Sequence, residues 1–136
     1  MTRWTVSSIA DLPVVSDGEL GDPVWHPLQH ALGIDTFGAN VFVARHADQL
    51  LVEEHDERDS GQQELYLVLD GSASFELDGE EARLERGDAL AVTDPGVRRR
   101  AKALSTGTTL LVVGSGEAAF ESTWNPAHFA DIPRPE

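Results

Sequence analysis

Short runs of alternating hydrophobic and polar residues fill the chain from residue 37 onward, and turn-forming residues separate these runs. In the clearest run, residues 64–70 (ELYLVLD), Glu64 and Tyr66 share one face of an extended strand, while the leucines share the other. Asp78-Gly79 lies between two such runs and is a strong signal for a two-residue β-hairpin. With no long helix between them, the runs predict an antiparallel β-sandwich or β-barrel. About eight short strands are expected, in residues 37–46, 50–57, 64–70, 72–77, 81–85, 89–93, 97–104 and 108–114.

The segments outside these strands have weaker patterns. A short strand is predicted near residues 4–6, and one or two helical turns within residues 24–32, with Pro27 near the start and Gly33 at the end. Residues 116–124 (GEAAFESTW) predict a short helix before a proline-rich end. We therefore expect a single domain. Residues 1–36 form an N-terminal extension packed on a barrel, residues 37–114 form the barrel, and residues 115–136 form a C-terminal tail.

Composition narrows the functional classes. A chain of 136 residues that is 40% hydrophobic has a suitable size for one domain with one core. No apolar run approaches the roughly 18 residues of a membrane span, and the N-terminus lacks the continuous apolar stretch of a signal peptide. The absence of cysteine excludes disulfides, thiolate metal sites and cysteine nucleophiles, and a cytoplasmic location is expected. The net charge of −14 repels nucleic acid, so we expect neither nucleic acid nor a membrane as a partner.

Three side chains that can bind a metal stand close together in this pattern. His55 and Glu57 are two residues apart, so they project from the same face of an extended strand. Glu64 opens the next predicted strand. If the two runs pair as neighbouring strands, one imidazole and two carboxylates converge. Such a set suits a hard or borderline divalent metal.

Two sequence motifs include these residues or follow them. His55 is followed by Glu64, and Gly71 comes seven residues after that glutamate. Further on, residues 87–96 run from Gly-Asp through a short apolar stretch to a Pro-Gly turn. In both motifs, and over residues 37–114 as a whole, the chain resembles the cupin superfamily. The resemblance implies a single-domain antiparallel jelly-roll β-barrel, and it implies a homodimer because cupins commonly pair by extending their sheets.

The chain departs from the cupin pattern at two ligand positions. Glu57 stands in place of the second histidine of the first motif, which reads His-Asp-Glu here. The histidine that ends the second motif is absent, and Arg98 or Arg99 occupies its place. An arginine stays protonated and has no free lone pair for a metal. The usual site of three histidines and one glutamate is therefore incomplete.

One interpretation of this incomplete site needs no metal. Glu64 forms a salt bridge with Arg98 or Arg99, because a buried carboxylate requires a cationic partner. An arginine on the inner face could also hold a carboxylate or phosphate of a ligand by two hydrogen bonds. Tyr66 shares the face of Glu64 and could contact the same ligand. The protein is then a small-molecule-binding cupin that acts as a sensor, carrier or accessory protein.

The other interpretation is a metal-dependent enzyme. His55, Glu57 and Glu64 hold one divalent ion (Mn, Fe, Ni or Zn) and leave coordination positions open. The implied reaction is that of an oxygenase or isomerase acting on a small polar or anionic substrate. A histidine from elsewhere, such as His30 or His46, could supply a missing ligand. A metal-free epimerase-like enzyme with His55 as its base lies between the two interpretations.

Overall fold

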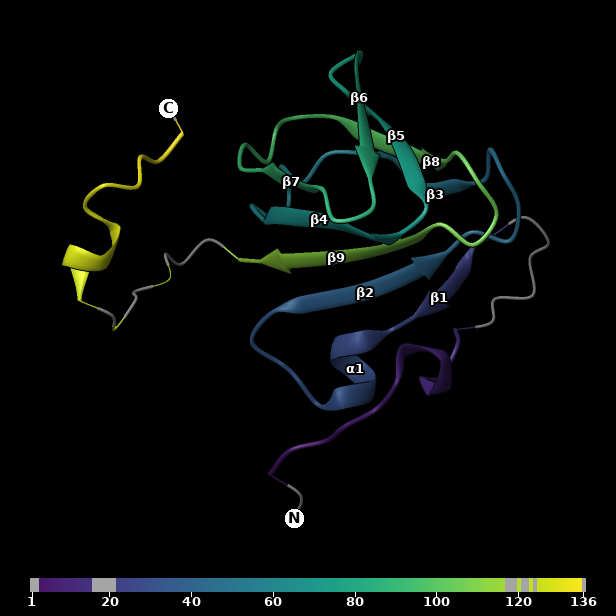
Figure 1. Cartoon of the computed structure of the whole chain (residues 1–136), viewed down its shortest axis with the longest axis horizontal. Coiled ribbons are helices and arrows are strands. Elements are labelled where there is room, and N and C mark those ends of the chain that lie inside the picture. Colours follow the sequence, from purple (N-terminus) through teal and green to yellow (C-terminus); the bar gives the residue numbers. More distant parts are fainter. Residues whose placement is uncertain (1–2, 16–21, 117–119, 121–122, 124, 136) are drawn as a thin grey trace.

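The computed structural model describes residues 3–15, 22–116, 120, 123 and 125–135. Within these residues the chain forms nine strands, one α-helix and two short 3₁₀ helices (Figure 1). The helices are η1 (Ile9–Asp11), α1 (Leu28–Leu32) and η2 (Pro126–Phe129). The strands are β1 (Val24–His26), β2 (Gly38–Val43), β3 (Leu50–His55), β4 (Gln63–Asp70), β5 (Ser72–Leu77), β6 (Glu80–Glu85), β7 (Ala89–Val92), β8 (Arg99–Ala103) and β9 (Thr109–Ser115).

The strands form two sheets that face each other across one core. The larger sheet has the order β1-β2-β9-β4-β7, and the smaller has the order β3-β8-β5-β6, with antiparallel neighbours throughout. Tyr66, Val68, Phe75, Ala101 and Leu110 are among the buried residues between them. No described strand belongs to both sheets, so side-chain packing joins the two halves of the jelly roll.

Strand alternation decides which side chains enter this core. In β4, Tyr66 and Val68 are buried, whereas Leu65 on the opposite face is 42% exposed. In β8, Arg99 and the two alanines are buried, and the residues between them are exposed. The alternation predicted for these strands is therefore confirmed. The leucine face of β4 is where a second subunit could pack, and the homodimer stays a prediction.

The N-terminal extension differs from the expectation. Residues 4–6 are exposed and form no strand, so the strand predicted there is wrong. β1 replaces the first part of the predicted helical stretch, because its backbone pairs with the edge of β2. Such a tertiary pairing overrides the local preference of a three-residue segment. The helical turns predicted within residues 24–32 are confirmed only for α1. This helix follows Pro27 and ends at Gly33, which has the left-handed conformation (φ 76°). It lies beside β2 in Figure 1.

The C-terminal tail is described only in part. The helix predicted over residues 116–124 lies mostly outside the described residues. Asn125 caps the start of η2, where its side chain accepts a hydrogen bond of 3.0 Å from the backbone N–H of Ala127. None of the helices in the described part of the chain has the length and apolar character needed to cross a membrane.

Two glycines with positive φ lie in turns of this fold, and substitutions there test how closely each turn is packed. Gly71 (φ 75°) joins β4 to β5, and Gly79 (φ 85°) lies in the β5–β6 hairpin. We expect Gly79→Ala to lower the free energy of unfolding by about 1–2 kcal/mol, from the left-handed conformation alone. Gly71→Ala should lower the free energy of unfolding at least about twice as much. The new Cβ would lie 2.9 Å from Cα of the buried Thr108 and against the Thr108 hydroxyl.

Urea unfolding of the two variants measures this difference. Gly79→Ala is the matched control, since a Cβ at that position meets no atom within 4 Å. Equal losses of stability would contradict the close packing of Gly71 against Thr108.

Candidate functional site

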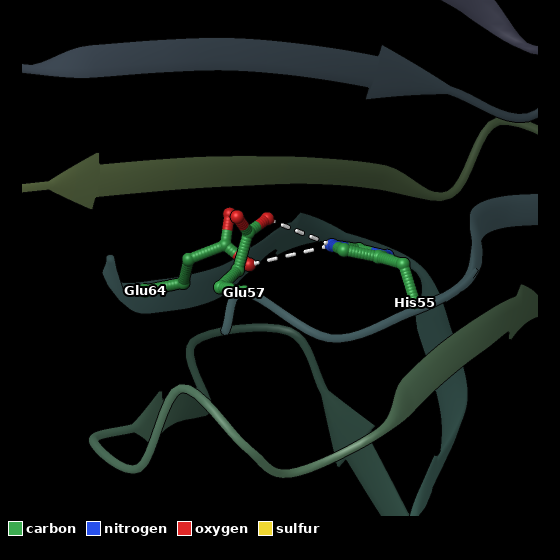
Figure 2. A group of neighbouring side chains, drawn as sticks. All are labelled: His55, Glu57 and Glu64. Atoms are coloured by element: carbon green, nitrogen blue, oxygen red, sulfur yellow. Dashed lines mark hydrogen bonds and ion pairs between the residues drawn. The ribbon is translucent and has the colours of Figure 1, made fainter. Parts of the chain in front are cut away.

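His55, Glu57 and Glu64 converge at one end of the core (Figure 2). The His55 Nε2 atom lies 3.0 Å from Oε1 of Glu57 and 3.7 Å from Oε1 of Glu64. One potential ligand atom from each residue lies within 4.8 Å of the other two. The convergence expected from the sequence is present, but its predicted cause is wrong. β3 and β4 are not neighbours, because they belong to opposite sheets, and the residues meet across the barrel.

A buried arginine adjoins this cluster. Arg99 lies opposite His55 in the pairing of β8 with β3, and its side chain has no exposed surface. Its Nη1 donates a hydrogen bond of 3.0 Å to Oε1 of Glu64. Arg98 faces outward, with a side chain that is 54% exposed and lies 3.6 Å from Glu54. Because adjacent strand residues face opposite sides, only one of the two arginines reaches the core, and it is Arg99.

One oxygen of Glu64 receives several of these contacts. Tyr66 lies two residues further along β4 on the same face, and its hydroxyl donates a hydrogen bond of 2.6 Å to Oε1. The same oxygen accepts the bond from Arg99 and lies near His55. The Glu64 side chain is only 10% exposed, so its charge needs a cation nearby. Arg99 supplies that cation from the opposite sheet.

The surroundings keep Tyr66 in its neutral form. Burial raises the pKa of the Tyr66 phenol far above its usual value, because a buried phenolate would lose its hydration. The hydrogen bond to Glu64 and the charge of that carboxylate raise the pKa further, and they outweigh the lowering by Arg99. The ring also packs edge-on against Phe75, with 5.1 Å between ring centroids. Tyr66 is therefore a hydrogen-bond donor to Glu64 and not a general base.

Both ring nitrogens of His55 face hydrogen-bond acceptors. Nδ1 lies 2.7 Å from the backbone carbonyl oxygen of Glu53, which can only accept, so Nδ1 carries a proton. Nε2 lies 3.0 Å from a carboxylate oxygen of Glu57, which is also an acceptor. A neutral imidazole has a single N–H and cannot donate to both. A second proton on the ring, or a cation between Nε2 and the carboxylates, satisfies this arrangement.

The guanidinium of Arg99 has unused donors. Its Nε and Nη2 atoms are buried and have no hydrogen-bond partner among the described residues. A buried donor without an acceptor destabilises a protein by about 1–3 kcal/mol, and by more when it is charged. Buried polar groups in native proteins are nearly always paired. This edge of Arg99 therefore requires a polar or anionic partner.

The connection between β3 and β4 fixes Glu57. The backbone N–H of Glu57 donates to the carbonyl oxygen of Pro95 at 2.8 Å, and the Ser60 hydroxyl donates to Oε2 of Glu57 at 2.5 Å. Gln62 follows on the same connection, and its Oε1 lies 2.6 Å from the place that a Cβ would take on Gly114. No motif spacing marks Ser60 or Gln62, so the sequence pattern does not predict their position at the site.

The donor set fits a divalent metal in part. One imidazole nitrogen and two carboxylate oxygens at these separations suit Mn, Fe(II) or Zn. His30 and His46 lie outside the metal-ligating group found in the described residues, so neither supplies the missing ligand. Arg99 places a positive charge 3.0 Å from one of the donor oxygens, where it opposes a second cation.

The environment of Tyr66 can be measured because the chain has one tyrosine. In the urea-unfolded chain the ultraviolet absorbance of tyrosinate should appear near pH 10, and in the folded protein only well above that pH. Because the folded pKa is raised, the stabilisation is fully present below about pH 10 and is lost as the pH rises toward the folded pKa. Tyr66→Phe should lack this alkaline loss of stability. A folded protein that titrates at the ordinary phenol pKa would contradict the buried Tyr66–Glu64 hydrogen bond.

Comparisons with known proteins address the fold. No protein-family model matches the chain, and no curated protein matches it. A cupin protein from Bacteroides fragilis is similar over 99% of this chain and 100% of its own, with 18% identity and a TM-score of 0.69. An RmlC-like cupin from Shewanella frigidimarina is similar over 86% of this chain and 93% of its own, with 19% identity and a TM-score of 0.64.

A third similar structure is a cupin-superfamily sugar phosphate isomerase from Silicibacter pomeroyi. The match covers 83% of this chain and 76% of the isomerase, with 17% identity and a TM-score of 0.67. At these identities the likeness concerns architecture, and it agrees with the two facing antiparallel sheets. The jelly roll predicted from the sequence is confirmed, and the chain has the cupin fold.

Proposed function

We propose that this protein binds a small molecule beside the Glu64–Arg99 pair and needs no metal to do so. One observation supports this most directly. Arg99 is fully buried and hydrogen-bonded to Glu64, at the place where the cupin motif has a metal-binding histidine. A guanidinium cannot coordinate a metal, and its charge already compensates the carboxylate. The chain thus provides its own cation where a metal would otherwise lie.

In this proposal the inner part of the site recognises the ligand. Arg99 offers Nε and Nη2, which have no partner within the described part of the chain. Tyr66 offers the lone pairs of its hydroxyl oxygen, since its proton is engaged by Glu64. His55 and Glu57, with side chains that are 37% and 19% exposed, form the outer part. These groups are suited to recognition, so a sensor, carrier or accessory protein is the role that we propose.

A metal-dependent enzyme is the second candidate, and the position of His55 favours it. Nε2 of His55 faces two carboxylates, and a cation bound between them would satisfy all three groups. His55, Glu57 and Glu64 would hold the ion, which would polarise an oxygen of the substrate as a Lewis acid. Glu57 is the more exposed carboxylate of the two and would transfer a proton. An isomerase or oxygenase acting on a small polar or anionic substrate is the corresponding activity.

Exchange of Arg99 for histidine separates the two candidates. We expect the wild-type chain, purified without chelator or metal-binding tag, to retain far less than one equivalent of Mn, Fe, Ni or Zn. Arg99→His removes a cation and places an imidazole opposite His55, so the affinity for Ni or Zn should rise at least about tenfold, or about 1.4 kcal/mol. Elemental analysis and calorimetric titration measure both quantities.

Arg98→His is the matched control for this experiment. It makes the same change one residue away, at an exposed side chain, and should leave metal binding as in the wild type. Stoichiometric metal in the wild-type protein, with no gain in Arg99→His, would overturn the metal-free proposal and support the enzyme.

The binding proposal has its own test. Thermal unfolding in the presence of chelator and a library of small acids, alcohols and sugars should reveal compounds that stabilise the wild-type chain. Tyr66→Phe should weaken the binding of such a compound, whereas Arg98→Lys should not. Stabilisation that depends on added metal would instead favour the second candidate.

A further inference from the structure

We infer that the ligand carries a carboxylate group, and that this group binds the Nε and Nη2 edge of Arg99. The inference rests on the proposed binding function and adds the chemical class of the ligand.

The protein uses only part of the Arg99 guanidinium. Nη1 donates to Glu64 at 3.0 Å, whereas Nε and Nη2 are buried and lack a partner among the described residues. These two nitrogens lie side by side on one edge of the planar group and direct two nearly parallel N–H bonds. The two oxygens of a carboxylate accept both bonds at once, and this pairing is geometrically specific for arginine. A single neutral oxygen matches this edge less well.

The neighbouring charges favour a carboxylate over a phosphate. Glu57 and Glu64 already contribute two carboxylates to the cluster around His55. Another carboxylate adds one negative charge, whereas a phosphate monoester adds about 1.5 to 2 near neutral pH. Like charges that share a site oppose one another. A planar anion of single charge is therefore the better complement to one guanidinium edge.

Access to this edge requires a local movement of the protein. Arg99 has no exposed surface, so a ligand reaches it only after a covering side chain moves. Gln62 lies beside Glu64, because Gln62 Oε1 and Glu64 Cγ are 2.6 Å and 3.6 Å from the same place, that of a Cβ on Gly114. Within the described residues, the Gln62 side-chain amide has no hydrogen bond that would hold it there.

The Nε–Hε groups of arginine give a direct measurement of this contact. Sodium acetate is titrated into the full chain at constant ionic strength, and the arginine Nε–Hε signals are followed by ¹H–¹⁵N NMR. Sodium chloride, acetamide and inorganic phosphate are titrated in parallel. We expect acetate to shift the Arg99 signal in a saturable manner, with smaller effects of chloride and acetamide and weaker binding of phosphate.

Two lysine variants provide the matched comparison. Arg99→Lys keeps the charge but loses the planar edge, so acetate should bind at least about tenfold more weakly, as followed in both proteins through the backbone amide signals of neighbouring residues. Arg98→Lys makes the same change at an exposed neighbour and should stay within about twofold of the wild type. The Arg99→Lys spectrum also assigns the Arg99 signal. If this variant does not fold, triple-resonance assignment of the wild-type protein identifies the Arg99 signal, and the selectivity of the wild-type titration decides the question.

The outcomes distinguish this inference from the proposed function. Equal shifts with chloride or acetamide, or unchanged acetate binding in Arg99→Lys, would overturn the inference. Tighter binding of phosphate than of acetate would overturn the choice of carboxylate. A neutral library compound that binds beside Tyr66 without moving the Arg99 signal would refute the inference and leave the proposed function standing. If neither acetate nor any library compound binds at this end of the barrel, both fail.

Discussion

The hydrogen-bonded ion pair between Glu64 and Arg99 is the contact on which the site depends. It joins β4 of the larger sheet to β8 of the smaller sheet, inside a structure that side-chain packing otherwise holds together. Each charge is buried, and each would be strongly unfavourable without the other. The pair also fixes the oxygen that accepts the Tyr66 hydroxyl and lies near His55. Removal of either partner would therefore disturb the whole cluster and not one bond alone.

An arginine in this position changes what the barrel can do chemically. A metal ion has several coordination positions and can exchange a water for substrate, so it combines charge compensation with reactivity. A guanidinium compensates the charge but directs its remaining N–H bonds in fixed directions within one plane. The consequence is recognition by shape and hydrogen bonding. The partly exposed His55 and Glu57 are the cluster members that retain the chemistry of a metal ligand or proton carrier.

Much of this arrangement could be predicted from the sequence, and the remainder has identifiable causes. The alternation in ELYLVLD placed Glu64 and Tyr66 on one face correctly, because a half-buried strand has a strict period of two. The same period explains why Arg98 and Arg99 could not be distinguished: a shift of one residue exchanges the two faces of a strand. β1 and the placement of Gln62 depend on contacts between distant segments, for which a local pattern carries no signal.

His55 and Arg99 have opposite requirements, and both lie near the same oxygen atom. Nε2 of His55 faces two carboxylates and needs a ring proton or a cation, whereas Nε and Nη2 of Arg99, which have no partner among the described residues, need a polar or anionic acceptor. Both groups act on Oε1 of Glu64, which lies 3.0 Å from Nη1 of Arg99 and 3.7 Å from Nε2 of His55. A charge bound at either group would therefore act on the other through this one carboxylate oxygen.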